Sequence, residues 1–511
     1  MDDYKAAKES FVSGLTGSTV THINLISSVA LASIALYSAI QTRVFRTRAI
    51  PFFISWIVLL LPLLLSMTLF ANKPGLLSCL SLVPTAFLWF TTPAPEGSFI
   101  PLPASDRSPV PPSVTPMYTQ SQGYSVEVKE RPRLPLLPAI TTYRAHMMLM
   151  TMLGILAVDF TIFPRALAKC ESYGVSLMDL GVGSFVFSNG VVSAIPLLKN
   201  PSHLSSPLLP KLSAVVRKTI PIIALGVIRV ILVKGTDYPE HETEYGVHWN
   251  FFISLALLPI LQVLLHPLIR VMPASVLGIG VGILQQLALS VFGLKEYVRT
   301  APRLNLISAN KEGFTSLTGY LAIHLLGLSI GTLILPPSPS FFRRLLTGRV
   351  TVAQLGTARQ NDKGAIELAS YAMVWWALLG LGSLVSIDEG VSRQTANLPY
   401  VLWISAFNTS SIFGYLVLDM LFFPAPPTSR KSMPTENSPT SATARAPPLL
   451  EAINKNALPL FLFANVVTGL VNLSMQTIYA SASVSMAVLS VYALVLCSVA
   501  WRLRDTRVWR L

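Results

Sequence analysis

The chain has 511 residues, of which 52% are hydrophobic and 12% are charged. Its mean hydropathy of +0.58 indicates more apolar surface than one water-soluble core can bury, which predicts an integral membrane protein. The formal net charge of +14 does not indicate nucleic-acid binding, because no Lys- or Arg-rich recognition element accompanies it and cytoplasmic loops of membrane proteins carry such an excess. The three cysteines form no CxxC pair, so a structural metal and redox chemistry are disfavoured.

The polar amino-terminal segment lacks the basic start of a cleavable signal peptide, so the first apolar run is expected to be an uncleaved anchor. About thirteen apolar runs follow, each long enough to cross the roughly 30 Å hydrocarbon layer as a helix. They cover residues 22–42, 50–71, 75–91, 143–162, 180–197, 219–234, 250–270, 275–294, 316–336, 369–386, 399–423, 457–475 and 480–501. The predicted fold is all-α: a polytopic membrane bundle of about 13 transmembrane helices, forming a single domain over residues 1–511.

Two connections between spans are crowded with Pro, Ser and Thr, namely residues 92–139 and 425–448. Such compositions cannot bury a core, so both are expected to be flexible linkers. Most Lys and Arg residues fall in the loops after odd-numbered spans, which predicts that these loops, including both linkers, are cytosolic. The amino terminus is then lumenal, the carboxyl terminus cytosolic and the loop after residue 158 lumenal.

That lumenal loop contains the clearest chemical signal in the chain. Asp159 and Lys169 flank Pro164 and Arg165 at the end of an apolar run. Inserting a carboxylate at the middle of a membrane helix costs about 2.5–3.5 kcal/mol of free energy, and less near the interface, so Asp159 is expected to have a use there. On an unbroken helix the two charges would be separated by about 15 Å, so the chain must turn at Pro164 for both to act together. The alternative is that Asp159 caps a span while Arg165 and Lys169 extend toward lipid headgroups.

Further polar residues in loops or near span ends are predicted to contact substrate: Arg144, Arg165, Asp179, His248, Asn250, Arg303, Lys311, Arg393 and Asn397. The arginines and Lys311 suit phosphate, although basic interfacial residues commonly meet anionic headgroups instead. Asp179 lies where an acid stabilises a helix amino end, so a cap and a substrate contact both stay open.

His248 lies in the loop sequence HETEYGVH, which lacks the spacing of an HExxH zinc pair. The residue can serve as a second base, as a hydrogen-bond partner of substrate or as a structural histidine. No metal site and no cofactor are predicted.

Several blocks of the chain also carry a family resemblance. They cover residues 5–19, 155–169, 176–187, 243–252, 309–313, 392–400 and 465–472, and they resemble the GPI-anchor inositol acyltransferases. The resemblance implies transfer of an acyl chain, typically palmitoyl, from acyl-CoA to the inositol ring of glucosaminyl-phosphatidylinositol at the endoplasmic reticulum. It implies acyl-CoA as co-substrate in a setting of membrane lipids, and it points to Asp159 and Lys169 as catalytic residues. No obligate protein partner is evident from the sequence.

The residues themselves agree with such chemistry. An inositol hydroxyl is a poor nucleophile, and Asp159 at a partly dry boundary would have a raised pKa that suits a general base. Lys169 could stabilise the oxyanion, orient Asp159 or hold the phosphate. Direct transfer is favoured over an acyl-enzyme, since no G-x-S-x-G elbow is present. The competing hypotheses are a secondary transporter or lipid flippase that uses Asp159 and Arg229 as intramembrane charges, and a noncatalytic scaffold subunit.

Overall fold

The computed structural model describes residues 2–46, 48–92, 134–135, 137–234, 242–424 and 445–509. Each predicted span falls on a helix or on two successive helices. In chain order these are α2 (Val20–Ser27) with α3 (Val29–Ile40), α4 (Phe52–Leu59) with α5 (Leu61–Ser66), α6 (Leu76–Thr91), α7 (Pro138–Ala157), α8 (Leu177–Lys199), α9 (Leu208–Lys234), α11 (Phe251–Leu264) with α12 (His266–Val271), α13 (Ala274–Ser290), α16 (Lys311–Ile334), α18 (Asn361–Leu384), α19 (Leu398–Phe422), α21 (Ala457–Ser474) and α22 (Ala482–Arg502).

Shorter helices lie outside the predicted spans: α1 (Asp2–Val12), α10 (Glu242–Tyr245), α14 (Leu294–Thr300), α15 (Leu306–Ala309), α17 (Phe341–Leu346) and α20 (Pro448–Lys455). The predicted linkers 92–139 and 425–448 lie almost entirely outside the described residues. The carboxyl-terminal ends of both linkers are helical, because α7 begins at Pro138 and α20 at Pro448. Proline is well suited to the first turn of a helix.

Seven helices in the described part of the chain are long and apolar enough to cross a membrane, or eight if α13 and α14, bent by 59°, form one span. The prediction of a polytopic helical membrane protein is confirmed. The other predicted spans are helical but shorter or more polar; α6 and α11, for example, have 16 and 14 residues.

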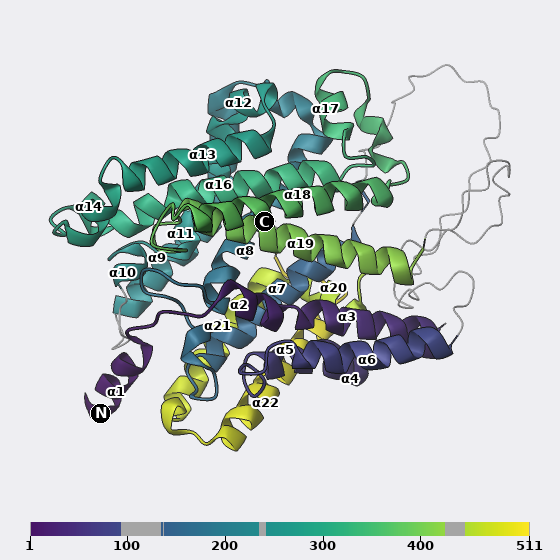
Figure 1. Cartoon of the computed structure of the whole chain (residues 1–511), viewed down its shortest axis with the longest axis vertical. Helices are drawn as coiled ribbons and strands as arrows, with labels where there is room; N and C mark the ends of the chain where they lie inside the picture. Colours follow the sequence, from purple (N-terminus) through teal and green to yellow (C-terminus); the bar gives the residue numbers. More distant parts are fainter. Residues whose placement is uncertain are drawn as a thin grey trace, which may run out of the picture.

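Most long helices run across the view of Figure 1 in similar directions, so the bundle has two ends. The helices α1, α10 and α14 lie at its left-hand end. Helix α16 lies in the interior, because 72% of its apolar 18-residue stretch is buried. It approaches α8 closely, because a Cβ added at Gly190 would lie 2.0 Å from the His324 carbonyl oxygen and one at Gly327 would lie 2.2 Å from the Phe187 carbonyl oxygen.

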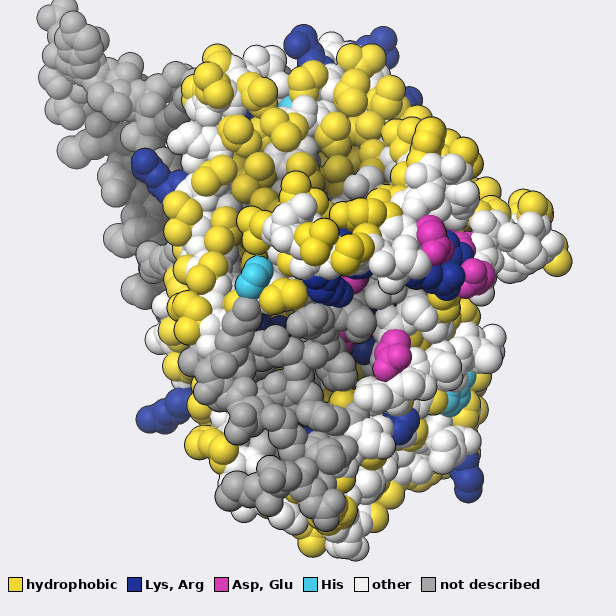
Figure 2. All heavy atoms as spheres, turned by 90° about the vertical axis from the view of Figure 1, so that its left-hand side faces the viewer, with side chains coloured by type: hydrophobic (Ala, Val, Ile, Leu, Met, Phe, Trp, Pro, Cys, Tyr) yellow, Lys and Arg dark blue, Asp and Glu magenta, His cyan; other side chains and the backbone are white. Residues whose placement is uncertain are grey.

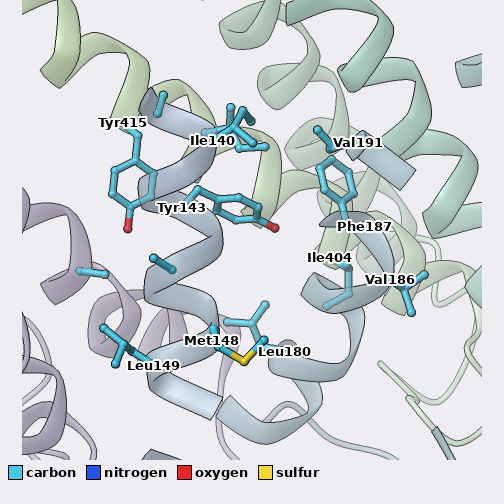
Figure 3. Packing of buried hydrophobic residues seen from close by; sticks show 14 of the residues in the cluster. Ile140, Tyr143, Met148, Leu149, Leu180, Val186, Phe187, Val191, Ile404 and Tyr415 are labelled. Atoms are coloured by element: carbon cyan, nitrogen blue, oxygen red, sulfur yellow. The ribbon is translucent and has the colours of Figure 1, made fainter. Parts of the chain in front are cut away.

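Helix α7 leads into the predicted catalytic loop, and its contacts with α8 and α19 hold it in place. Tyr143 and Met148 of α7 point toward α8 in Figure 3, where Met148 lies beside Leu180. The Tyr143 hydroxyl donates a hydrogen bond to Asn408 Oδ1 of α19 at 2.7 Å. His146 Nδ1 lies 2.8 Å from the Tyr415 hydroxyl. Such interhelical hydrogen bonds satisfy polar side chains inside an apolar bundle, and they fix α7 against α19.

Candidate active site

The loop after α7 turns where the sequence predicts that it must. Helix α7 ends at Ala157, two residues before Asp159. The chain then passes through turns and Pro164 into a 3₁₀ turn over Arg165–Leu167. Proline cannot continue the hydrogen bonding of a helix, so the interruption follows from the sequence. Asp159 is therefore a loop residue at the end of the bundle rather than a residue within a helix.

The Asp159 carboxylate is buried, with 7% of the residue exposed. Its Oδ2 accepts a hydrogen bond of 2.7 Å from the Asn472 side-chain amide of α21. Its Oδ1 lies 3.8 Å from the ammonium nitrogen of Lys8, on α1. An ion pair at that distance leaves Oδ1 able to accept a proton or a closer hydrogen bond. We call Lys8, Asp159 and Asn472 the Asp159 cluster.

Burial raises the pKa of Asp159 above its ordinary value, while the hydrogen bond from Asn472 and the charges of Lys8 and Arg165 act in the opposite direction. Desolvation disfavours the charged form of a carboxyl group, and nearby cations favour it. A carboxylate with this balance can take up a proton more readily than an ordinary aspartate, which is the property needed of a general base.

Arg165 stabilises the turn. Its Nη2 donates to the carbonyl oxygens of Val158 and Phe163 at 2.7 and 3.0 Å, and its guanidinium carbon lies 3.8 Å from the centre of the Phe11 ring. The alternative in which Arg165 extends toward lipid headgroups is therefore wrong for this side chain. Arg165 instead closes the loop that presents Asp159.

Lys169 forms a different ion pair. Its Nζ lies 2.9 Å from Glu244 Oε2 of α10, and the two side chains are 30% and 22% exposed. The ion-pair partner that the structure gives to Asp159 is Lys8, whereas that of Lys169 is Glu244. The pair of Lys169 with Glu244 is thus partly exposed, unlike the buried carboxylate of Asp159.

Asp179 and Arg393 form a buried ion pair. The Arg393 Nε donates to Asp179 Oδ1 at 2.6 Å, and each side chain is 1% exposed. Asp179 Oδ2 also accepts from the Cys170 backbone and the Ser176 hydroxyl. Ser176, not Asp179, is the residue that caps α8. A carboxylate with this many partners joins the loop to the bundle, and we call this pair the Asp179 cluster.

Two asparagines predicted to contact substrate cap helices. The Asn250 Oδ1 accepts from backbone amides at the start of α11, and the Asn397 Oδ1 accepts from Tyr400 at the start of α19. The Asn397 amide also donates to Asp388 at 3.0 Å. Side-chain capping satisfies amides that a helix start leaves unpaired.

The remaining predicted substrate contacts are dispersed. Arg303 forms a two-pronged ion pair with Glu312, and Lys311 donates to the Ala301 carbonyl oxygen. His248 is exposed in the loop before α11, and Arg144 lies on α7. Contact of any of these side chains with substrate stays a prediction.

The end of the bundle at the left of Figure 1 faces the viewer in Figure 2. Acidic and basic side chains lie next to one another on one part of this face, amid apolar and uncharged surface. On α14, which lies at this end, Lys295 pairs with Asp388 and Arg299 pairs with Glu389. Among the residues that the structure describes, no group of three or more His, Cys, Asp or Glu could hold a metal ion.

Comparison with known proteins places these features in a family. The model of the GWT1 family matches residues 4–503. The chain belongs to the GWT1 family. Curated members include GPI-anchored wall transfer protein 1 of Aspergillus fumigatus, 41% identical over 99% of this chain and 98% of the relative, and that of Cryptococcus neoformans var. grubii, 38% identical over 99% and 100%. The Gibberella zeae protein of the same name is 40% identical over 97% of this chain and 96% of its own.

Sequence reasoning missed three partners in this GWT1 chain. Lys8 and Asn472 contact Asp159, and Glu244 contacts Lys169. Each is a polar residue at or near a helix end, a position where many polar residues occur for ordinary reasons. Their sequence separation from the loop, 313 residues for Asn472 and Asp159, left no local signal of the contact.

Proposed function

We propose that the protein is a membrane-bound acyltransferase of GPI-anchor biosynthesis. It transfers a fatty acyl chain, typically palmitoyl, from acyl-CoA to the inositol ring of glucosaminyl-phosphatidylinositol in the endoplasmic reticulum membrane. Membership of the GWT1 family and the names of its relatives support a role in the GPI pathway. The single structural observation that carries the chemistry is a buried carboxylate, Asp159, on a loop outside the helices.

Asp159 acts as the general base. Its carboxylate takes the proton of an inositol hydroxyl as the hydroxyl oxygen attacks the thioester carbonyl carbon. The new C–O bond forms, the C–S bond breaks, and the proton passes from Asp159 to the departing thiolate of CoA. General-base catalysis of this kind contributes about 10²–10⁴-fold to a rate, and no covalent acyl-enzyme is required.

Lys169 stabilises the oxyanion that develops on the thioester carbonyl. Its position on the same loop and its partial exposure of 30% support this role, since a fixed cation at a developing negative charge is an effective electrostatic catalyst. The carboxylate of Glu244 positions the Lys169 ammonium group through their contact of 2.9 Å.

The remaining predicted residues divide by chemistry. Arg144, Arg303 and Lys311 suit the lipid phosphate by their charge, whereas Arg393 is held in its buried pair with Asp179. His248 suits sugar hydroxyls by its hydrogen-bonding groups, whereas the side chains of Asn250 and Asn397 are engaged in capping helices. The proposed orientation has a lumenal amino terminus, a cytosolic carboxyl terminus and catalytic residues that face the lumen, in line with the distribution of Lys and Arg.

The deciding experiment measures transfer of labelled palmitate from palmitoyl-CoA to glucosaminyl-phosphatidylinositol by detergent-purified protein. Covalently acylated lipid is the expected product. A transporter or flippase using intramembrane charges would move lipid across vesicle membranes without a covalent change. Flux without acylated product, from protein shown to be folded, would replace the acyltransferase proposal.

A further inference from the structure

The contacts of Asp159 come from three distant parts of the chain. The residue itself follows α7, Lys8 comes from the amino-terminal helix α1, and Asn472 comes from the end of α21. Lys8 and Asn472 also contact each other, with Lys8 Nζ 3.5 Å from Asn472 Oδ1. The three polar groups therefore form one closed set of contacts around a buried carboxylate.

The orientation of the Asn472 amide is fixed by its neighbours. Its Oδ1 accepts from the Thr477 hydroxyl at 3.3 Å and from Lys8. The Lys8 ammonium can only donate, so the amide oxygen must face it and the NH₂ group must face Asp159. The amide then occupies Asp159 Oδ2 at 2.7 Å and leaves Oδ1 toward the Lys8 ammonium.

Helix α1 is attached to the same loop that carries Asp159. The Phe11 ring covers the Arg165 guanidinium, and the Gly14 amide donates to Glu171 Oε1 at 2.7 Å. Ser18 pairs with Val175 in an isolated bridge. These contacts hold Lys8 at a defined place beside Asp159.

The chain segments meet so closely that glycine is required at the crossing. Gly17 and Gly174 have φ of +79° and +139°, and a Cβ on Gly174 would lie 2.1 Å from the Thr16 carbonyl oxygen. Backbone of this conformation favours glycine. The amino-terminal segment and the catalytic loop are thus built to lie against each other.

We infer that Lys8 and Asn472 are positioning residues for the catalytic base: Asn472 fixes the direction of the Asp159 carboxylate at 2.7 Å, and Lys8 places a cation 3.8 Å from the other carboxylate oxygen. The inference rests on the proposed acyltransferase function and deepens it. Lys8 keeps its own proton throughout, so the atom and proton balance of the transfer is unchanged. The inference also gives helix α1 a role in catalysis, because α1 supplies Lys8, the cation that faces Asp159.

The alternative is that Lys8 and Asn472 only anchor α1 and α21. The pH dependence of kcat/KM separates the two roles. The charged groups that act on Asp159 are Lys8 from α1 and Arg165 from its own loop, and the Asn472 hydrogen bond acts in the same direction. All three lower the pKa of Asp159 against the rise caused by burial. Since the ionised form is the active base, removing Lys8 or Asn472 moves the acidic limb of the profile to higher pH.

The test uses the purified full-length chain and the palmitate transfer assay. We compare Lys8→Ala, Lys8→Arg and Asn472→Ala with the wild type over a range of pH. Asn465→Ala is the matched control, because Asn465 lies on the same helix, is exposed and, within the part of the chain that the structure describes, bonds to the Phe461 carbonyl oxygen of that helix. Melting temperature of each variant is measured in the same detergent to identify any variant that does not fold.

The inference predicts that Lys8→Ala and Asn472→Ala lose about 10²-fold in kcat at neutral pH, as misplaced catalytic groups do, with an acidic limb shifted to higher pH. Lys8→Arg restores most of the rate because the charge is kept, and Asn465→Ala behaves as wild type. Folded Lys8→Ala and Asn472→Ala proteins with the wild-type pH profile, beside an active wild type, would overturn the inference alone. Absence of acyl transfer by folded wild-type protein would overturn the proposed function and the inference with it.

Discussion

The Asp159 cluster and the Asp179 cluster contain two buried aspartates from neighbouring parts of the chain with opposite surroundings. Asp179 has its oxygens occupied by Arg393, Ser176 and the Cys170 amide at 2.6–3.0 Å. Asp159 has one hydrogen bond, from Asn472, and a cation at 3.8 Å. Each oxygen of Asp179 thus accepts a hydrogen bond of 3.0 Å or less, whereas Asp159 Oδ1 faces the more distant ammonium group of Lys8. Burial alone therefore does not mark a catalytic acid or base, and the number of partners distinguishes the two.

The largest expected effect comes from removing Arg393, the cation of the Asp179 cluster. Arg393→Ala leaves Asp179 buried and without its ion pair, and removal of one partner from such a pair costs about 3–5 kcal/mol. Thermal unfolding in detergent should show a large loss of stability. Arg299→Ala is the control, since its pair with Glu389 is about half exposed and such pairs contribute about 0–1 kcal/mol. Equal melting temperatures for the two variants would contradict a structural role for the Asp179 cluster.

Removal of Lys169 should lower the catalytic rate and leave the stability nearly unchanged. Lys169→Ala is expected to lower kcat by about 10²–10³-fold if the side chain stabilises the oxyanion. Its partly exposed pair with Glu244 should contribute at most about 1 kcal/mol to stability. Steady-state kinetics with palmitoyl-CoA, with Lys218→Ala on α9 as the exposed control, measures the effect. A raised KM with unchanged kcat would instead assign Lys169 to substrate binding.

The smallest expected effect concerns the packing that supports both clusters. Gly190→Ala would place a methyl group 2.0 Å from the His324 carbonyl oxygen, and overpacking of this kind costs about 1–3 kcal/mol. Gly280→Ala on α13 meets nothing within 4 Å and should be neutral or stabilising by about 0.5–1 kcal/mol. Melting temperatures of the two variants give the comparison. A Gly190→Ala protein as stable as Gly280→Ala would mean that α8 and α16 can separate without cost.

The positions of the helices could be predicted because length and hydrophobicity are local properties of the sequence. Asp159 was found for the same reason, as a charge at the end of an apolar run followed by Pro164. The predicted span 143–162 was placed too far along the chain, since α7 runs over Pro138–Ala157. Pro138 starts the helix and the turn before Pro164 ends it.

The contacts of the candidate site could not be predicted in the same way. Lys8 and Asn472 reach Asp159 only through the packing of α1 and α21 against the loop, which is set by the whole bundle. Asn250 and Asn397 show a different difficulty, because each directly precedes an apolar run and so carried the signal of a helix cap as well as that of a polar binding residue. Their hydrogen bonds to backbone amides favour the cap.

The most direct test of Asp159 as the general base is the rate of palmitate transfer by Asp159→Asn. This substitution keeps the shape of the side chain and an oxygen for the Asn472 amide but removes the basic carboxylate. The account predicts a loss of about 10²–10⁴-fold in kcat with a melting temperature and palmitoyl-CoA binding close to those of the wild type. A folded Asp159→Asn protein that transfers palmitate within a few-fold of the wild-type rate would contradict it.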